Sequence, residues 1–202
     1  MKKETFTFSI RDITEIAMLC ALAIVLDKFV KIPIGATGGS LNIAAFPLFV
    51  IALRHGWFKG LIGGGIVFGL ISCLLDDYGM QCYPFDYFLA FGSVCILGIF
   101  GNYINNTLNN GRKIDIVKAY GLIILSVCAF ALIRLAGATI DSMLFFNTDG
   151  TLTIIGALIY NASYVLPSAG LVLAIIILLV PVILSLNKTY PTKYLQAKKE
   201  QE

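Results

Sequence analysis

The chain has few charged residues, and this scarcity excludes an ordinary soluble fold. Only 13% of its 202 residues are charged, whereas a soluble domain has about 25%. Hydrophobic residues make up 58%, and the mean hydropathy is +0.86. A soluble protein of this composition would expose apolar patches that promote aggregation, while lipid tolerates them. We therefore expect a multi-pass protein of the cell membrane, in which residues 1–202 form a single domain.

Motifs for catalysis and metal binding are also missing. His55 is the only histidine, and the five cysteines form no CxxC pair and lie away from it. This argues against a zinc site or a disulfide framework. The chain has no GxxxxGK[ST] loop and no Ser/His/Asp arrangement. We therefore expect no enzyme, no metal or other cofactor, and no nucleic-acid partner.

What the chain does have is a series of long apolar segments. A membrane-spanning helix needs about 20 apolar residues, and the segments lack the period-2 alternation of a membrane barrel. The second segment is short, while the last is long and contains Pro167, where we expect a kink. The pattern predicts an all-α bundle of six transmembrane helices, at residues 13–31, 41–54, 57–75, 86–105, 116–141 and 152–186.

The basic residues indicate the orientation. If the N-terminus is cytoplasmic, 12 of the 15 basic residues fall on the inner side, which is the positive-inside pattern. Both termini are then cytoplasmic, and residues 188–202 form a cytoplasmic tail. Among the inner residues, Arg54, His55 and Lys59 flank Trp57, as interfacial anchors do. The outer side is acidic, which favours cationic solutes, unless aspartates are simply kept out of the inner loops.

Small residues mark places where helices pack closely in a membrane. The third span contains the GxxxG pairs Gly60–Gly64 and Gly65–Gly69. They predict close packing inside the monomer, with a dimer interface as the alternative. Ala17 and Ala21 form a smooth stripe on the first span. This stripe packs either within the bundle or against another membrane protein.

A polar cluster opens the fourth span. Polar side chains at membrane depth are costly and by default indicate a functional site. Tyr83, Asp86 and Tyr87 lie where this span begins. Asp86 is either an N-cap, stabilised by the helix dipole, or a carboxylate facing a pocket. A carboxylate among aromatic rings suits a flat, cationic ligand.

Two further polar clusters lie on the last two spans. Asn161 and Tyr164 share a helix face with Tyr160, and they either bond to other helices or bind a ligand. Arg134 and Asp141 project from one side of the fifth span, about 10 Å apart. Arg134 needs a partner at this depth. It either forms a structural ion pair or binds an anionic group of a ligand.

Several short motifs, taken in order, resemble those of one family of membrane proteins. The chain resembles the substrate-binding S component of an energy-coupling factor (ECF) vitamin transporter, nearest the thiamine-specific group. The motifs are Ala17-x-x-x-Ala21, Ser40-Leu41-Asn42-Ile43, Phe46-Pro47-Leu48, Ala52-Leu53-Arg54-His55-Gly56, Asp86-Tyr87-Phe88-Leu89-Ala90-Phe91, Gly137, and Tyr160-Asn161-Ala162-Ser163-Tyr164 with Pro167.

The resemblance implies a function and a set of partners. It implies a six-helix bundle in an ABC-type importer, binding thiamine or a related cationic, heteroaromatic compound near the outer face. Residues 31–40, with Gly35, Gly38 and Gly39, would form a mobile lid over the ligand. The stripe of Ala17 and Ala21 would dock on a membrane coupling protein driven by two ATPase subunits.

The resemblance also assigns site residues. It matches Asp86-Tyr87 to an acidic residue followed by tyrosine, and Asn161 to an asparagine on the last span. The thiamine group also uses a histidine and a tryptophan on the fifth span, where alignment on Gly137 places Ile133 and Asp141. Two alternatives remain. One is a scaffold or assembly subunit without a ligand. The other is a membrane-embedded enzyme, which would need His, Asp or Glu side chains converging at one depth.

Overall fold

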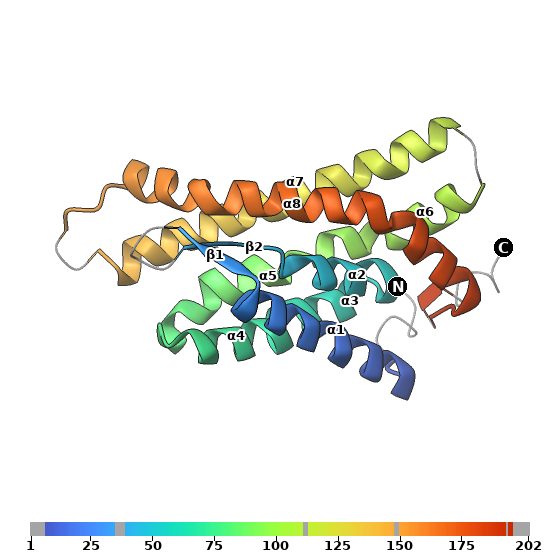
Figure 1. Ribbon diagram of the computed structural model, residues 1–202, viewed down its shortest axis with the longest axis horizontal. Helices are drawn as coiled ribbons and strands as arrows, with labels where there is room; N and C mark the ends of the chain where they lie inside the picture. Colours follow the sequence, from blue (N-terminus) through green and yellow to red (C-terminus); the bar gives the residue numbers. More distant parts are fainter. Residues whose placement is uncertain (1–6, 35–38, 111–112, 148–149, 193, 196–202) are drawn as a thin grey trace.

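The computed structural model is a helical membrane bundle (Figure 1) and describes residues 7–34, 39–110, 113–147, 150–192 and 194–195. The six predicted spans are confirmed, although two of them are divided into several helical segments. The first and second are α1 (Ile10–Phe29) and α2 (Ala45–His55), and the last two are α7 (Lys113–Phe145) and α8 (Ile154–Thr189). The third span comprises α3 (Trp57–Leu61), η2 (Ile62–Phe68) and α4 (Gly69–Asp76). The fourth span comprises η3 (Met80–Cys82), η4 (Tyr83–Leu89), α5 (Ala90–Gly92) and α6 (Cys95–Asn110).

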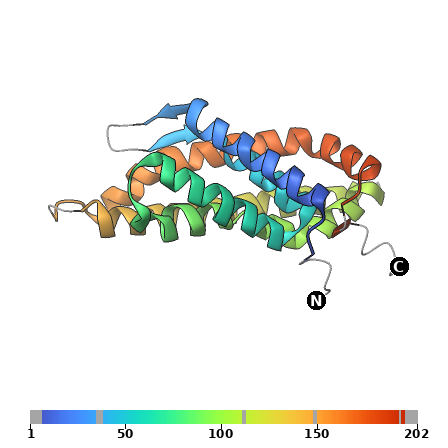
Figure 2. The same cartoon turned by 90° about the horizontal axis from the view of Figure 1, so that it is seen from below.

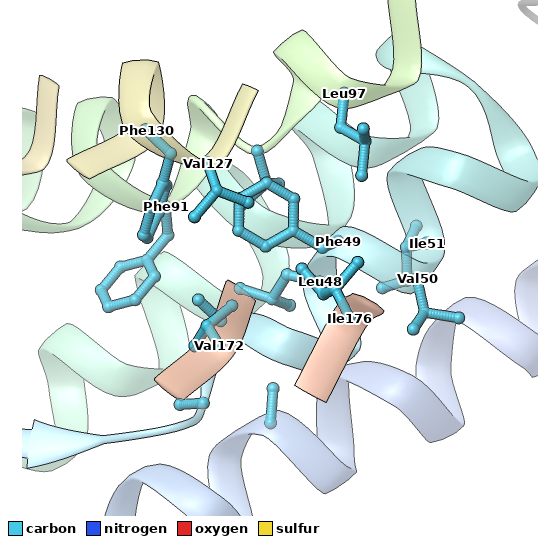
Figure 3. Close-up of a cluster of buried hydrophobic side chains, with 14 of the residues drawn as sticks. Leu48, Phe49, Val50, Ile51, Phe91, Leu97, Val127, Phe130, Val172 and Ile176 are labelled. Carbon is cyan, nitrogen blue, oxygen red and sulfur yellow. The ribbon is translucent and has the colours of Figure 1, made fainter. Parts of the chain in front are cut away.

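Four of these spans are long and apolar enough to cross a membrane unaided: the third, the fourth, α7 and α8. The short helix α2 lies among α1, α3, α6 and α8, and nearly all of its side chains are buried. A helix that is apolar on every face belongs in an interior. In Figure 3, Phe49 of α2 faces Phe130 of α7, with ring centroids 5.1 Å apart. The core is therefore built around α2.

The glycines of the third span bring it against the fourth span. A Cβ atom on Gly64 would lie 2.5 Å from the carbonyl oxygen of Phe91, and one on Gly65 would lie 3.2 Å from the Cα of Gly92. Only residues without a side chain permit this approach. The predicted packing within the monomer is confirmed. The contact includes two π-helical segments, η2 and η4, which face each other.

Two features differ from the predictions. Both ends of the predicted lid, residues 31–40, belong to a small antiparallel sheet, in which β1 (Lys31–Pro33) pairs with β2 (Ser40–Asn42). We call residues 31–34 and 39–42 the hairpin; Gly35 and Gly38 lie outside the described residues. Pro167 does not interrupt α8, which continues as one helix, and the bend visible in Figure 1 lies in its red C-terminal part.

The interpretation of Arg54, His55 and Lys59 as interfacial anchors is wrong, because all three are at most 1% exposed. Lys59 Nζ lies 2.9 Å from Asp12 Oδ2, and Arg54 pairs with Glu15. His55 lies between the two carboxylates, with Nδ1 3.5 Å from Asp12 and Nε2 3.4 Å from Glu15. Carboxylates on α1 thus compensate the positive charges, which makes burial possible.

Amide side chains extend this ionic cluster to the far side of the bundle. Arg54 Nη1 donates to Asn187 Oδ1 at 2.5 Å, and Asn187 Nδ2 donates to Asn105 Oδ1 at 2.6 Å. The cluster therefore connects α1, α2, α3, α6 and α8 at the end of the bundle where α1 begins and α8 ends. It fixes the position of α1.

Ala17 and Ala21 face away from the bundle. Both are exposed, whereas Ala23 on the opposite face is buried. In Figure 2, α1, in blue, runs obliquely across the near side of the bundle. The alanine stripe is therefore not used for packing within the monomer.

Candidate functional site

A cavity of about 440 Å³ lies at the end of the bundle that carries the hairpin, and α7 and α8 form much of its wall. This volume falls in the range of pockets for small organic ligands. Four tyrosines and two aspartates account for much of its polar character. Its lining residues are Gly39, Tyr78, Cys82, Asp86, Tyr87, Ala138, Asp141, Ser142, Phe146, Thr151, Leu152, Ala157, Tyr160, Asn161 and Tyr164.

Most of the residues predicted to form the site meet in this cavity. Six of the eight line it, coming from three spans that are distant in sequence: Asp86, Tyr87, Asp141, Tyr160, Asn161 and Tyr164. Arg134 lines a smaller adjoining cavity of about 80 Å³, which we call the annex, together with Asp86. Tyr83 lies outside both cavities, and its hydroxyl donates to the Gly65 carbonyl at 3.1 Å.

Asp86 is not an N-cap. It lies inside the π-helical segment η4, which Cys82 precedes without any side-chain cap. Such segments often occur at functional sites because they re-aim side chains. Asp86 is only partly buried because it borders both the cavity and the annex.

Arg134 is buried beside Asp86 in the annex, and its Cζ lies 4.7 Å from the centroid of the Phe91 ring. Within the described part of the chain, no carboxylate oxygen lies within 4.0 Å of its guanidinium nitrogens. The expected structural ion pair with another helix is therefore not formed as a direct contact. Asp86, Asp27 and Asp76 line the annex with Arg134.

Tyr87 belongs to a polar network that the sequence did not indicate. Its hydroxyl donates to Asp76 Oδ2 at 2.9 Å, and Lys28 Nζ lies 2.6 Å from the other Asp76 oxygen. Lys28 also lies 3.2 Å from Asp27 Oδ2. The charge of Asp76 is thus compensated. The only signal in the sequence was the adjacent pair of Asp27 and Lys28 near the end of the first span.

Asp27 connects this network to the hairpin. Its carboxylate accepts hydrogen bonds from Asn42 Nδ2 at 3.1 Å and from Ser72 Oγ at 2.6 Å. The backbone N–H of Asn42 donates to Ser168 Oγ on α8 at 3.1 Å. The second strand of the hairpin is therefore held by α1 and α8, while α4 bonds to the same Asp27 carboxylate.

Asn161 and Tyr164 bond to each other and to α7. The Tyr164 hydroxyl donates to Asn161 Oδ1 at 2.7 Å, and Asn161 Nδ2 donates to Ser142 Oγ at 3.1 Å. Asn161 therefore makes the interhelical hydrogen bond expected of a structural residue while it also lines the cavity. The ring of Tyr164 forms part of the wall.

Tyr160 attaches the hairpin to α8 beside the cavity. Its hydroxyl accepts a hydrogen bond from the Gly39 N–H at 3.2 Å and donates to the Ile34 carbonyl at 3.1 Å. One side chain thus bonds to both arms of the hairpin. Gly39 lies against the Tyr164 ring, where a Cβ atom would clash. The hairpin therefore covers part of the cavity through contacts with two tyrosines.

Tyr78 lies in the loop before the fourth span, where its ring packs edge-on against Phe146 with centroids 5.9 Å apart. Partial desolvation raises the pKa of its hydroxyl above the ordinary value, although the side chain is 43% exposed, and the nearby Asp76 carboxylate raises it further. Tyr78 therefore keeps a neutral hydroxyl, which can donate or accept a hydrogen bond.

Asp141 differs from the other polar lining residues. It is 4% exposed, and its Oδ1 atom has no hydrogen-bond partner within the described residues. The Asn161 amide, by contrast, bonds to Ser142 and Tyr164. The cavity is thus acidic and aromatic, and Asp141 supplies it with a buried carboxylate oxygen that has no partner among the described residues.

Comparisons with known proteins agree with this architecture. The model of the thiamine transporter protein family matches residues 13–188. The thiamine transporter ThiT of Bacillus subtilis (strain 168) is 32% identical over 191 residues, which cover 86% of this chain and 94% of that protein. A solved structure of ThiT from Listeria monocytogenes has the same fold, with a TM-score of 0.66 at 21% identity, covering 92% of this chain and 97% of that chain. Since the family model matches most of its length, the chain belongs to the thiamine transporter protein family.

Proposed function

We propose that this protein is the substrate-binding S component of an ECF-type importer and that it binds thiamine or a close cationic, heteroaromatic relative. The observation that carries the proposal is the cavity beside the hairpin, which two carboxylates and four tyrosines line. The family match supports transport rather than catalysis, because the matched relatives are transporters.

The chemistry of the cavity suits thiamine. Its thiazolium ring carries a positive charge, and its aminopyrimidine ring carries N–H donors. The rings of Tyr87, Tyr160 and Tyr164 offer faces and edges to flat groups, and aromatic rings attract cations. The carboxylates offset the loss of hydration that a buried cation suffers. An anionic solute would meet two acidic groups in the same cavity and would be repelled.

Energy for uptake has to come from other subunits in this proposal. The sequence has no nucleotide-binding loop, and the exposed stripe of Ala17 and Ala21 offers a smooth helix surface within the membrane. Small residues allow another helix to approach closely. We expect this stripe to contact a membrane coupling protein, which two ATPase subunits drive.

Calorimetric titration of the purified protein tests the ligand. Thiamine is expected to bind with a stoichiometry of one, and its uncharged thiophene analogue, which has the same shape, is expected to bind more weakly. Failure of thiamine to bind would contradict the proposed ligand. Native mass spectrometry of the protein as purified would then show whether another small molecule is bound or whether the chain is a ligand-free scaffold.

A further inference from the structure

The two carboxylates of the cavity have different electrostatic surroundings. Asp86 is only partly buried and also borders the annex, which Arg134, Lys31, Asp27 and Asp76 line with it. Opposite charges in one small cavity attract each other even without direct contact. Asp86 therefore has charged side chains of both signs around it.

Asp141 lines the main cavity but not the annex, and no cationic side chain of the described residues lines the main cavity with it. Other polar residues of the lining include Cys82, Ser142 and Asn161. The Asn161 amide is already bonded to Ser142 and Tyr164. Asp141 Oδ1 therefore stays without a partner in the described part of the protein.

An unpaired buried carboxylate oxygen costs folding free energy. Such costs are typical of binding sites, where a ligand supplies the missing partner. Asp141 meets the geometric condition, since it is 4% exposed and lines a cavity large enough for an organic ligand.

We propose that Asp141 supplies an unpaired negative charge that receives the positive charge of the ligand. This inference rests on the proposed function and names the residue that selects a cation. It follows that removing the charge of Asp141 changes the preference for charged over uncharged ligands.

The main test compares Asp141→Asn with wild type by calorimetric titration, using thiamine and its uncharged thiophene analogue as probes. The substitution keeps the shape and removes the charge. We expect affinity for thiamine to fall on the order of 10- to 150-fold, the effect of losing one charge-assisted hydrogen bond. Affinity for the analogue should change by less than about 3-fold. Asp115→Asn, in the first turn of the same helix, is the matched control and should leave both affinities unchanged.

A second readout separates a binding role from a structural one. Because Asn carries no charge to bury, ligand-free Asp141→Asn should unfold at the same temperature as wild type or at a higher one. A structural residue would show the opposite, with lower thermal stability and equal losses of affinity for both probes. That result would overturn the proposal, as would an unchanged affinity for thiamine.

Asp86→Asn, titrated with the same two probes, gives the comparison within the cavity. If Asp86→Asn loses the preference for thiamine over the analogue while Asp141→Asn keeps it, then Asp86 is the counter-charge and the proposal is wrong. If wild type does not bind thiamine at all, the proposed ligand fails before any variant is compared.

Discussion

The hydroxyl of Tyr160 is the most direct place to test whether the hairpin retains the ligand. It bonds to the Gly39 N–H and to the Ile34 carbonyl, and these groups lie on the two arms of the hairpin. Tyr160→Phe removes both bonds and keeps the ring, which packs against Tyr164 with centroids 5.9 Å apart. The change therefore affects the attachment of the hairpin much more than the wall of the cavity.

The size of the effect follows from the two bonds. Each hydrogen bond contributes about 0.5–1.5 kcal/mol net, so losing both weakens the closed position of the hairpin by about 1–3 kcal/mol. If the ligand leaves only when the hairpin lifts, dissociation should accelerate by about 5- to 150-fold, since 1.4 kcal/mol corresponds to a factor of ten. Association should change little, because the open state is already competent to bind.

Release of radiolabelled thiamine from purified protein, chased with unlabelled thiamine, measures this rate. Tyr103→Phe is a suitable control, since Tyr103 is an exposed tyrosine of α6 and lines neither the cavity nor the annex. Hydrogen exchange at the Gly39 amide gives an independent measure, and it should be faster in Tyr160→Phe. Faster exchange with an unchanged release rate would refute the idea that the hairpin retains the ligand.

Three further predictions concern the rest of the molecule. Ala17→Leu should reduce uptake by the complete transporter and leave thiamine affinity unchanged, because it adds bulk to a contact surface; normal uptake would exclude this surface. Lys59→Met should lower the free energy of unfolding by about 3–5 kcal/mol, since it leaves the Asp12 carboxylate buried without its cation, and thermal unfolding in detergent would show a lower midpoint than wild type. Adding Asp12→Asn should recover part of the loss. Reporter fusions at both ends should give cytoplasmic signals, and an outer signal from either end would contradict the six-span topology.

The sequence predicted the spans well because lipid imposes a length and an apolar composition that are visible in the chain itself. It also predicted much of the cavity lining, since polar side chains such as Asp141 and Asn161 stand out in apolar segments. The same reasoning failed for Tyr83. No pattern of apolar residues marks the π-helical segment η4, so the directions of Tyr83, Asp86 and Tyr87 could not be assigned from helical spacing.

The buried ionic cluster lay beyond sequence reasoning for a different reason. Arg54 pairs with Glu15 and Asn187, which are 39 and 133 residues away. A basic residue near Trp57 fits the pattern of an interfacial anchor as well as that of a buried ion pair. Only the positions of its partners distinguish these two interpretations. The same holds for Asp27, whose partner Ser72 lies 45 residues further along the chain.

The short helix α2 has a consequence for how the protein enters the membrane. Its 11 residues span about 16 Å at 1.5 Å per residue, whereas the hydrocarbon core is about 30 Å thick. A segment of this length that ends in Arg54 and His55 is poorly suited to partition into lipid from the translocon on its own. The carboxylates of Asp12 and Glu15, which compensate these charges, are synthesised earlier, on α1. We therefore expect α2 to insert into the membrane together with its neighbours, because its insertion depends on the helices around it.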